Sequence, residues 1–152
     1  EEPNTPVFYN NKYVKDNVKM PLAHGERVFG RWEYIRYFMD NSIQVIQPDI
    51  GNAGGITETK RICDMAYTFD VGVQIHTCAS HLLTPPSVQL EACIPNFVIH
   101  EQHMRSMNPS NQELTAKVVM PKNGYLDVTD DIGIGNEWSD KALASEDQIT
   151  LN

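Results

Sequence analysis

Four ionisable side chains stand at the ends of four short apolar segments of this sequence: Glu26, Asp49, His76 and Glu101. Side chains alternate between the two faces of a strand, so each of these residues shares a face with the residue two positions before it. In parallel α/β folds the carboxyl ends of the strands converge on the active site. If the segments are parallel strands, the four groups are therefore predicted to meet there.

These side-chain types suit the abstraction of a proton next to a carboxylate. Glu26, with another carboxylate nearby, could hold Mg²⁺ through oxygen ligands. A neutral His76 is a competent base near pH 7, and Asp49 on the adjacent strand end could fix its tautomer and raise its basicity. Glu101 could donate or accept a hydrogen bond at a developing oxyanion. Together they predict proton abstraction with a metal stabilising the resulting enediolate.

Each residue also has a simpler structural interpretation. Asp49 precedes the stretch "IGNAGG" and could cap the helix or turn that follows. Glu101 lies near His100 and His103 and could form surface ion pairs with them. Arg27 could balance the charge of its neighbour Glu26 or bind substrate, and His103 could contact substrate. The set of four strand ends, more than any single residue, predicts a catalytic site.

Short strands alternate with helices along the first two thirds of the chain. Strands are predicted over residues 21–26, 42–49, 71–76 and 96–101, and helices over residues 30–41, 56–69 and from 84 onward. Thr84 suits the N-cap of the last helix and Pro85 its first helical position. This order predicts parallel strands joined by right-handed crossovers, which doubly wound sheets and (β/α)₈ barrels satisfy equally.

Two of the predicted helices carry apolar residues at helical spacing. Residues 30–41 place Trp32, Ile35 and Met39 on one face. Residues 56–69 have the clearest amphipathic pattern, with apolar residues at i, i+3, i+4 and i+7. The members of that stripe are Ile62, Met65, Ala66 and Phe69. From Gln102 onward the alternation stops, and the turn-rich remainder is expected to fold back as a tail.

Composition excludes several classes of function. The 152 residues have a net charge of −8, so the surface would repel a phosphate backbone, and nucleic acid is not an expected partner. No apolar run approaches the roughly 20 residues that a membrane span needs, so no membrane association is expected. The cysteines are Cys63, Cys78 and Cys93, an odd number without a C-x-x-C pair, which favours reduced thiols and a cytoplasmic location.

Five motifs in order give the sequence a resemblance to a known family. They are "EEP" at 1–3, "PLAHGER" at 21–27, "IQPDIGNAGGITE" at 46–58, "VGVQIH" at 71–76 and "IPNFVIHEQ" at 94–102. The sequence resembles the enolase superfamily, within it the mandelate racemase subgroup, and most closely its acid-sugar dehydratases of the galactonate type. The likeness runs over nearly the whole chain.

The resemblance implies a modified TIM (β/α) barrel with Mg²⁺ at its C-terminal face. On the matching positions, Glu1 and Glu26 are the implied metal ligands. Asp49 and His76 are the implied base dyad, and Glu101 the residue that hydrogen-bonds the substrate carboxylate as it becomes an enediolate. Asp49 is accordingly expected to orient His76, and the glycine-rich turn is expected to let the backbone leave the strand sharply.

The resemblance covers only part of such a barrel, from the end of its fourth strand to its eighth. Residues 1–103 are expected to form this C-terminal half, and residues 104–152 a tail that packs back on the barrel or on a capping domain. A TIM barrel takes about 250 residues. A fragment, a cleaved chain or a half completed by another polypeptide is therefore expected, with the first strands, the capping domain and a further metal ligand supplied elsewhere.

The implied activity is Mg²⁺-dependent dehydration of a sugar acid to a 2-keto-3-deoxy acid, in a protein that forms homo-oligomers. A racemase, epimerase or cycloisomerase of the same superfamily would share the first step without the loss of water. A truncated chain that turns nothing over is the alternative from another class. A zinc hydrolase is disfavoured, because the sequence has no close His pair such as H-x-H and no set of cysteine ligands.

Overall fold

The computed structural model describes residues 1–3 and 8–145 of the chain. They belong to two compact units. The first unit comprises Glu1–Thr77 and Leu90–Glu101. The second comprises Cys78–Gln89 and the chain from Gln102 onward.

The first unit alternates helices and strands as predicted, although its regular strands are much shorter. Its elements in chain order are α1 (Phe8–Asn17), β1 (Ala23–His24), α2 (Gly30–Met39), β2 (Val45–Ile46), α3 (Ile50–Ala53), α4 (Gly55–Thr68), β3 (Gly72–Val73) and β4 (His76–Thr77). Helix α5 (Thr84–Ala92) runs from the second unit into the first, and β5 (Glu101–Gln102) closes the first unit.

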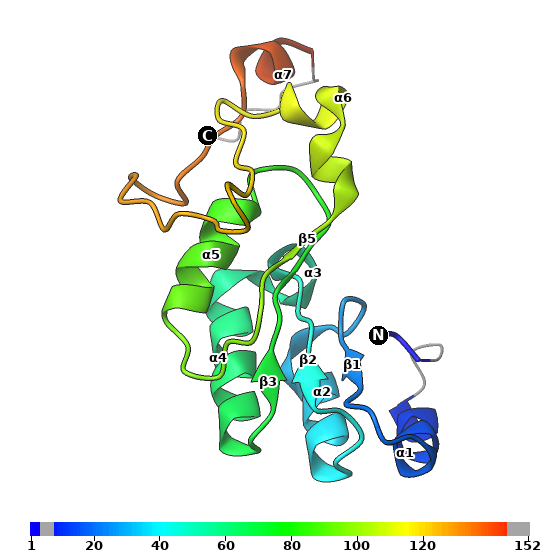
Figure 1. The fold of residues 1–152 in the computed structure, drawn as a ribbon. Helices are drawn as coiled ribbons and strands as arrows, with labels where there is room; N and C mark the ends of the chain where they lie inside the picture. The colour runs from blue at the N-terminus through cyan, green and yellow to red at the C-terminus, as the bar shows by residue number, and fades with distance from the viewer. Residues whose placement is uncertain (4–7, 146–152) are drawn as a thin grey trace. The chain divides into compact units, whose positions relative to one another are not determined.

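The strands of the first unit are parallel. β1, β2 and β3 form one sheet in that order, with Ala23 opposite Val45 and Val45 opposite Gly72 (Figure 1). β4 and β5 form a second, two-stranded sheet. A parallel bridge between Asp49 and His76 continues the pairing beyond the end of β2. Successive strands therefore end side by side, as a strand–helix–strand order requires.

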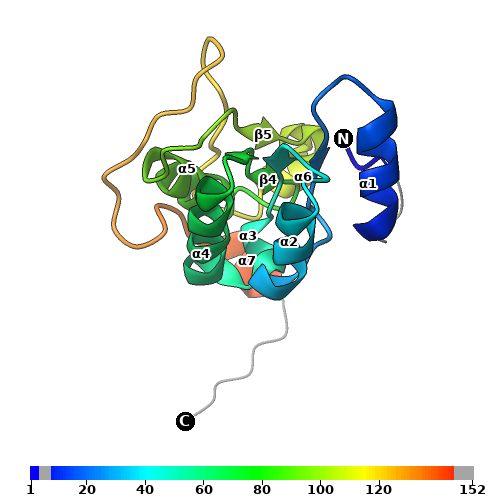
Figure 2. The same cartoon turned by 90° about the horizontal axis from the view of Figure 1, so that it is seen from below.

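Helices α2 and α4 pack against each other alongside the sheet (Figure 2). The buried face of α2 consists of Tyr34, Tyr37 and Phe38, and that of α4 includes Ile62 and Ala66. Opposite these helices, the strands contribute fully buried apolar residues. They are Ile46, Val73 and Ile75. Removing this apolar surface from water is what holds such short strands in register.

Beyond β5, the described part of the second unit consists of short helices and extended turns. Its elements after β5 are η1 (Met104–Met107), α6 (Pro109–Gln112) and α7 (Asp140–Ser145). The buried His81 organises it: Nε2 lies 2.9 Å from the Ser106 carbonyl oxygen, and Nδ1 accepts from the Val119 backbone N–H at 3.3 Å. The His81 carbonyl accepts from the Asn136 amide. His81 is thus a structural residue.

Among the described residues, no helix combines the length and the apolar character that crossing a membrane would demand.

Candidate active site

The first unit brings together all four strand-end residues that the sequence singled out. His76 is the centre of the group. Its Nδ1 lies 2.8 Å from Asp49 Oδ2, and its Nε2 lies 3.1 Å from Glu26 Oε2 and 3.9 Å from Glu101 Oε1. One imidazole therefore faces three carboxylates that come from three different strand ends.

Asp49 divides its two oxygens between two tasks. Oδ2 accepts from His76, while Oδ1 accepts the backbone N–H of Gly51 at 2.7 Å and caps helix α3. The helix ends after one turn at Gly54, whose φ of +114° lies in the left-handed region that favours glycine. The predicted cap is confirmed, and it holds the carboxylate in the position where it meets the imidazole, while the catalytic role of Asp49 stays a prediction.

The environment of His76 favours its protonated form. Burial opposes the charge, yet the hydrogen bond that His76 donates to Asp49 and the negative charges of Glu101, Asp49 and Glu26 outweigh it, so the pKa of His76 is raised above 6.5. Because a carboxylate only accepts hydrogen bonds, Nδ1 carries the proton that faces Asp49. Nε2 is then the nitrogen that can take up or release a proton within the site.

Glu26 lies between two cations of different kinds. Its Oε2 faces His76 Nε2, and its Oε1 receives Arg27 Nε at 3.0 Å. The Arg27 side chain is 68% exposed, so it borders the group at the solvent side. An exposed arginine in this position can balance the charge of Glu26 and still reach an anionic ligand.

Glu101 is held by two glutamines that the sequence analysis left without a role. The side-chain amides of Gln47 and Gln74 both donate to Glu101 Oε2, at 3.2 Å and 3.1 Å. This leaves Oε1 as the oxygen that faces His76. The signal was present in the sequence, because each glutamine stands two residues before Asp49 or His76 and thus on the same face of its strand.

The two glutamates at the start of the chain differ in their surroundings. Glu1 is exposed. Glu2 is half-buried, and its Oε1 accepts the backbone N–H groups of Gly25 at 2.9 Å and Glu26 at 3.2 Å. The family resemblance implied Glu1 as a metal ligand and gave Glu2 no role. Glu2 is therefore the residue of this pair that the fold connects to the strand end carrying Glu26.

The described residues do not form a complete metal site by themselves. Within residues 1–3 and 8–145, no group of three or more His, Cys, Asp or Glu side chains is arranged to hold a metal ion. Glu26 offers carboxylate oxygens of the kind that Mg²⁺ prefers, but both are engaged by Arg27 and His76. The donor chemistry fits Mg²⁺, and the number of donors requires ligands from elsewhere.

His103 belongs to the second unit. Its side chain is exposed, and its Nδ1 accepts the backbone N–H of Arg105 at 3.1 Å, which caps helix η1. This is the geometry of a local N-cap. Its suggested contact with substrate stays a prediction.

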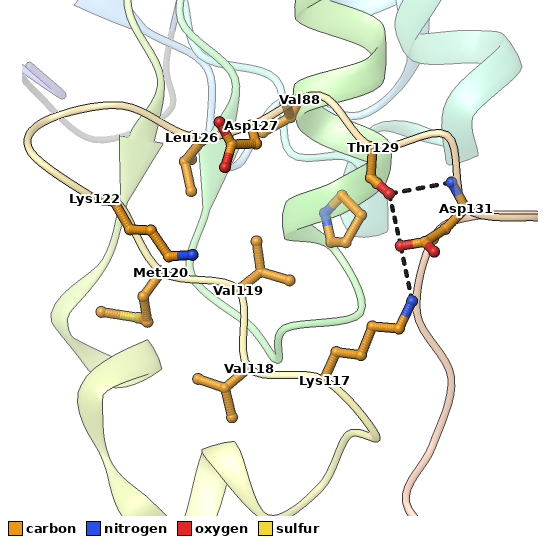
Figure 3. A pocket seen from close by; sticks show the side chains of 12 residues that line it. Val88, Lys117, Val118, Val119, Met120, Lys122, Leu126, Asp127, Thr129 and Asp131 are labelled. Carbon is orange, nitrogen blue, oxygen red and sulfur yellow. Dashed lines mark hydrogen bonds and ion pairs between the residues drawn. The ribbon is translucent and has the colours of Figure 1, made fainter.

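The second unit also contains a cavity of about 210 Å³ (Figure 3). Apolar side chains such as Val88, Val119 and Leu126 line much of it. At one side Lys117 Nζ lies 2.7 Å from Asp131 Oδ2, which also accepts from the Thr129 hydroxyl. Lys117 and Asp131 pair with each other there, and none of the four strand-end residues lines the cavity, so the His76 cluster remains the candidate catalytic centre.

Comparisons with known proteins agree with this architecture. The family model described as "Enolase C-terminal domain-like" matches residues 1–142. A D-galactonate dehydratase from Pectobacterium atrosepticum is 31% identical over 113 residues, which are 68% of this chain and 30% of that protein. A D-xylonate dehydratase from Haloferax volcanii is 27% identical over 136 residues, 89% of this chain and 33% of that protein.

Solved structures give the same result. A member of the enolase superfamily from Salmonella Typhimurium superposes with a TM-score of 0.94 at 41% identity, over 99% of this chain and 39% of its own. A mandelate racemase/muconate lactonizing enzyme-like protein from Rubrobacter xylanophilus gives 0.82 at 25% identity, over 93% and 36%. The chain thus spans about a third of the length of its relatives and corresponds to part of their TIM-barrel domain. It belongs to the enolase superfamily, in the enolase C-terminal domain-like family.

Proposed function

We propose that this chain is the part of a sugar-acid dehydratase that carries its base. The observation that supports this most is the buried His76–Asp49 pair, whose second ring nitrogen Nε2 faces Glu26 and Glu101 at the strand ends. The relatives named D-galactonate and D-xylonate dehydratase act, by name, on acids of this class. The proposed product is a 2-keto-3-deoxy acid.

In the proposed reaction His76 takes the proton from the carbon next to the substrate carboxylate, at Nε2. The C–H bond breaks and its electron pair forms the enediolate. The hydroxyl on the next carbon then leaves as water with the proton that Nε2 took up, and the enol that remains tautomerises to the 2-keto-3-deoxy acid. Asp49 stabilises the imidazolium that forms, because its Oδ2 lies 2.8 Å from Nδ1. Glu101, with a proton on Oε1, donates a hydrogen bond to the carboxylate of the substrate as negative charge develops there.

We propose Glu1 and Glu26 as ligands of Mg²⁺, which when bound would withdraw negative charge from the substrate carboxylate. The remaining ligands would come from the segment of the full polypeptide that corresponds to the unmatched part of the relatives. Arg27 and His103 are proposed to contact the anionic substrate. By this proposal the active protein contains the missing barrel strands and a capping domain and assembles as a homo-oligomer.

The metal proposal has a test that does not need turnover. In the full polypeptide that carries this chain, MgCl₂ should raise the melting temperature more than NaCl of equal ionic strength, because only the former supplies a ligand to the folded state. Glu26→Gln should abolish the difference. The isolated 152-residue chain should show none, because its described residues lack a three-ligand group. A specific Mg²⁺ shift in the isolated chain would contradict this division of the site.

The activity is tested by incubating the full polypeptide with Mg²⁺ and a panel of sugar acids that includes D-galactonate and D-xylonate, and following 2-keto-3-deoxy acid. A racemase or epimerase of the superfamily would instead exchange the α-hydrogen with D₂O without losing water. If no acid is turned over or exchanged by a folded, Mg²⁺-loaded protein, the catalytic proposal fails. The non-catalytic alternative, favoured by the chain's one-third share of its relatives, would then hold.

A further inference from the structure

A row of buried polar groups lies behind the strand end that carries Glu26. The hydroxyl of Tyr37 lies 3.2 Å from Nε2 of His24, and Nδ1 of His24 lies 2.6 Å from Oε2 of Glu2. The other oxygen of Glu2 accepts the backbone N–H groups of Gly25 and Glu26. His24 is fully buried, so water does not replace these contacts.

The position of each proton in this row follows from the Glu2 carboxylate at its end. The Glu2 carboxylate can only accept, so His24 must carry a proton on Nδ1. In the neutral imidazole Nε2 is then an acceptor, and the Tyr37 hydroxyl donates to it. Burial, with the nearby charge of Glu2, raises the pKa of Tyr37 to about 12, so its hydroxyl keeps the proton that it donates.

Among the described residues, Glu2 is the acceptor of both amides at the Gly25 turn. Gly25 has a φ of +144°, and a Cβ there would lie 2.8 Å from the Tyr34 hydroxyl oxygen and 3.0 Å from the Gln47 nitrogen. The Tyr34 hydroxyl already donates to the Gly25 carbonyl at 2.7 Å. The chain leaves β1 at this point, and the Gly25 and Glu26 N–H groups are directed to Glu2 instead of to a strand.

We propose that Glu2, supported by His24 and Tyr37, is the positioning residue that fixes the Gly25–Glu26 turn and thereby holds the Glu26 carboxylate in the site. The consequence for catalysis rests on the proposed function of Glu26, whereas the hydrogen-bond network does not. The proposal gives the adjacent glutamates separate duties: Glu1 is exposed, and Glu2 faces into the protein.

Hydrogen exchange measured by mass spectrometry on the peptide covering residues 23–28 tests the network in the full polypeptide. Glu2→Ala should speed exchange of the Gly25 and Glu26 amides by about tenfold or more, since hydrogen bonds to a carboxylate are the strong ones. Glu2→Gln keeps an oxygen acceptor and should restore most of the protection. Glu58→Gln is the matched control, because Glu58 also accepts a backbone N–H, from Arg31, away from the site.

The kinetic readout separates positioning from general stability. Glu2→Ala should lower kcat by roughly tenfold or more with KM changed little, and Glu2→Gln should recover most of it. Glu58→Gln should leave kcat unchanged, even if its melting temperature falls as much as that of Glu2→Ala. If Glu2→Ala does not fold, Tyr37→Phe deletes only the far hydroxyl and should give a smaller rise in exchange of the same peptide.

Three results would overturn the proposal. In a folded Glu2→Ala protein, unchanged exchange of the Gly25 and Glu26 amides would show that Glu2 does not protect them. Faster exchange with an unchanged kcat would show that Glu2 does not position Glu26 for catalysis. Equal kcat losses in Glu2→Ala and Glu58→Gln would reduce Glu2 to a general stabiliser. If the wild-type protein turns over no sugar acid, the proposed function fails separately, and the exchange measurement alone decides the network.

Discussion

Each contact of His76, the proposed base, has a separate origin. Asp49 fixes one nitrogen, and the other faces two carboxylates whose own orientations are set by further residues. Glu101 depends on a pair of glutamine amides, and Glu26 on a backbone turn held by Glu2. The arrangement of His76, Glu26 and Glu101 is thus maintained by residues outside the proposed reaction.

The glutamine pair predicts an asymmetric mutational response. Gln74→Leu removes one of two donors to Glu101 Oε2, so the remaining Gln47 amide should keep the carboxylate oriented and turnover should fall only about tenfold or less. The double Leu variant should lose more than the sum of the two single effects. Gln47→Glu should be worse than Gln47→Leu, because it places a second carboxylate against Glu101. Steady-state kinetics of the four variants checks this order, and strictly additive losses would contradict it.

The double task of Asp49 can be separated by substitution. Asp49→Asn keeps an oxygen that can cap α3 but loses the charge beside His76, whereas Asp49→Ala loses both. Urea unfolding should show Asp49→Ala less stable than Asp49→Asn by about 1 kcal/mol, the usual worth of an N-cap. Both variants should lose turnover to a similar extent. Equal stabilities would mean that the cap contributes nothing.

The convergence of the four strand-end side chains could be predicted from the sequence because strand-end position and two-residue alternation fix where they point. Their supports could not. Glu2 reaches the backbone of Gly25 across more than twenty positions, and a carboxylate that binds amides leaves no periodic signal. Alternation places Gln47 and Gln74 on the same strand faces as Asp49 and His76. That both amides donate to Glu101 is visible only once the strands are paired.

The helices α2 and α4 were predicted nearly to the residue, but the faces that they bury were not. In α2 the predicted face contained Trp32 and Met39, which are 74% and 72% exposed, while Tyr34, Tyr37 and Phe38 are buried. Both sets satisfy helical spacing, so periodicity alone could not choose between them.

In α4 the predicted stripe was Ile62, Met65, Ala66 and Phe69. The buried residues are Thr59, Ile62, Cys63 and Ala66. The buried stripe is rotated relative to the predicted one because Thr59 and Cys63 behave as small buried residues. The Thr59 hydroxyl donates to the Gly55 carbonyl.

The position of Cys63 on the buried face of α4 predicts selective thiol reactivity. Burial raises its pKa to about 12, whereas Cys93 is exposed. A thiol that is both buried and protonated does not react with alkylating agents, since the thiolate is the nucleophile. Iodoacetamide should label Cys93 in the native protein and Cys63 only in denaturant, as read by peptide mass spectrometry. Native labelling of Cys63 at the rate of Cys93 would contradict its placement.

Helix α5 carries a buried carboxylate whose titration affects stability. Both oxygens of Glu91 lie 2.9 Å from His100 Nδ1, and burial raises the pKa of Glu91 above 4.5 despite that contact and a hydrogen bond from the Ile75 backbone. The folded state therefore binds this proton more tightly than the unfolded chain does. The stabilisation is complete below pH 4.5 and is lost as pH rises through the window between 4.5 and the raised pKa.

Urea unfolding across that pH window measures the effect. The free energy of unfolding should fall with rising pH in the wild-type protein, and Glu91→Gln should remove this part of the slope while keeping an acceptor for His100. An identical slope in the variant would assign the pH dependence to other groups.

At the scale of the whole molecule, the parallel α/β architecture follows from the order of its segments, and the family follows from five motifs in register. The choice between a doubly wound sheet and a barrel did not follow from the order alone. It needed the family resemblance, since the described strands form two short sheets and the chain covers about a third of its relatives. Short helices beyond Gln102 were missed, because their four to six residues are too few for periodicity to register.

The most direct test of the account is turnover of D-galactonate and D-xylonate by the full polypeptide with Mg²⁺, in D₂O, with His76→Asn beside the wild-type protein. We expect a 2-keto-3-deoxy acid from the wild type with at least one sugar acid of this class. His76→Asn should bind Mg²⁺ and unfold as the wild type does, but turn over roughly 10²–10⁴-fold more slowly. Undiminished turnover by a folded His76→Asn variant would contradict the assignment of His76 as the base.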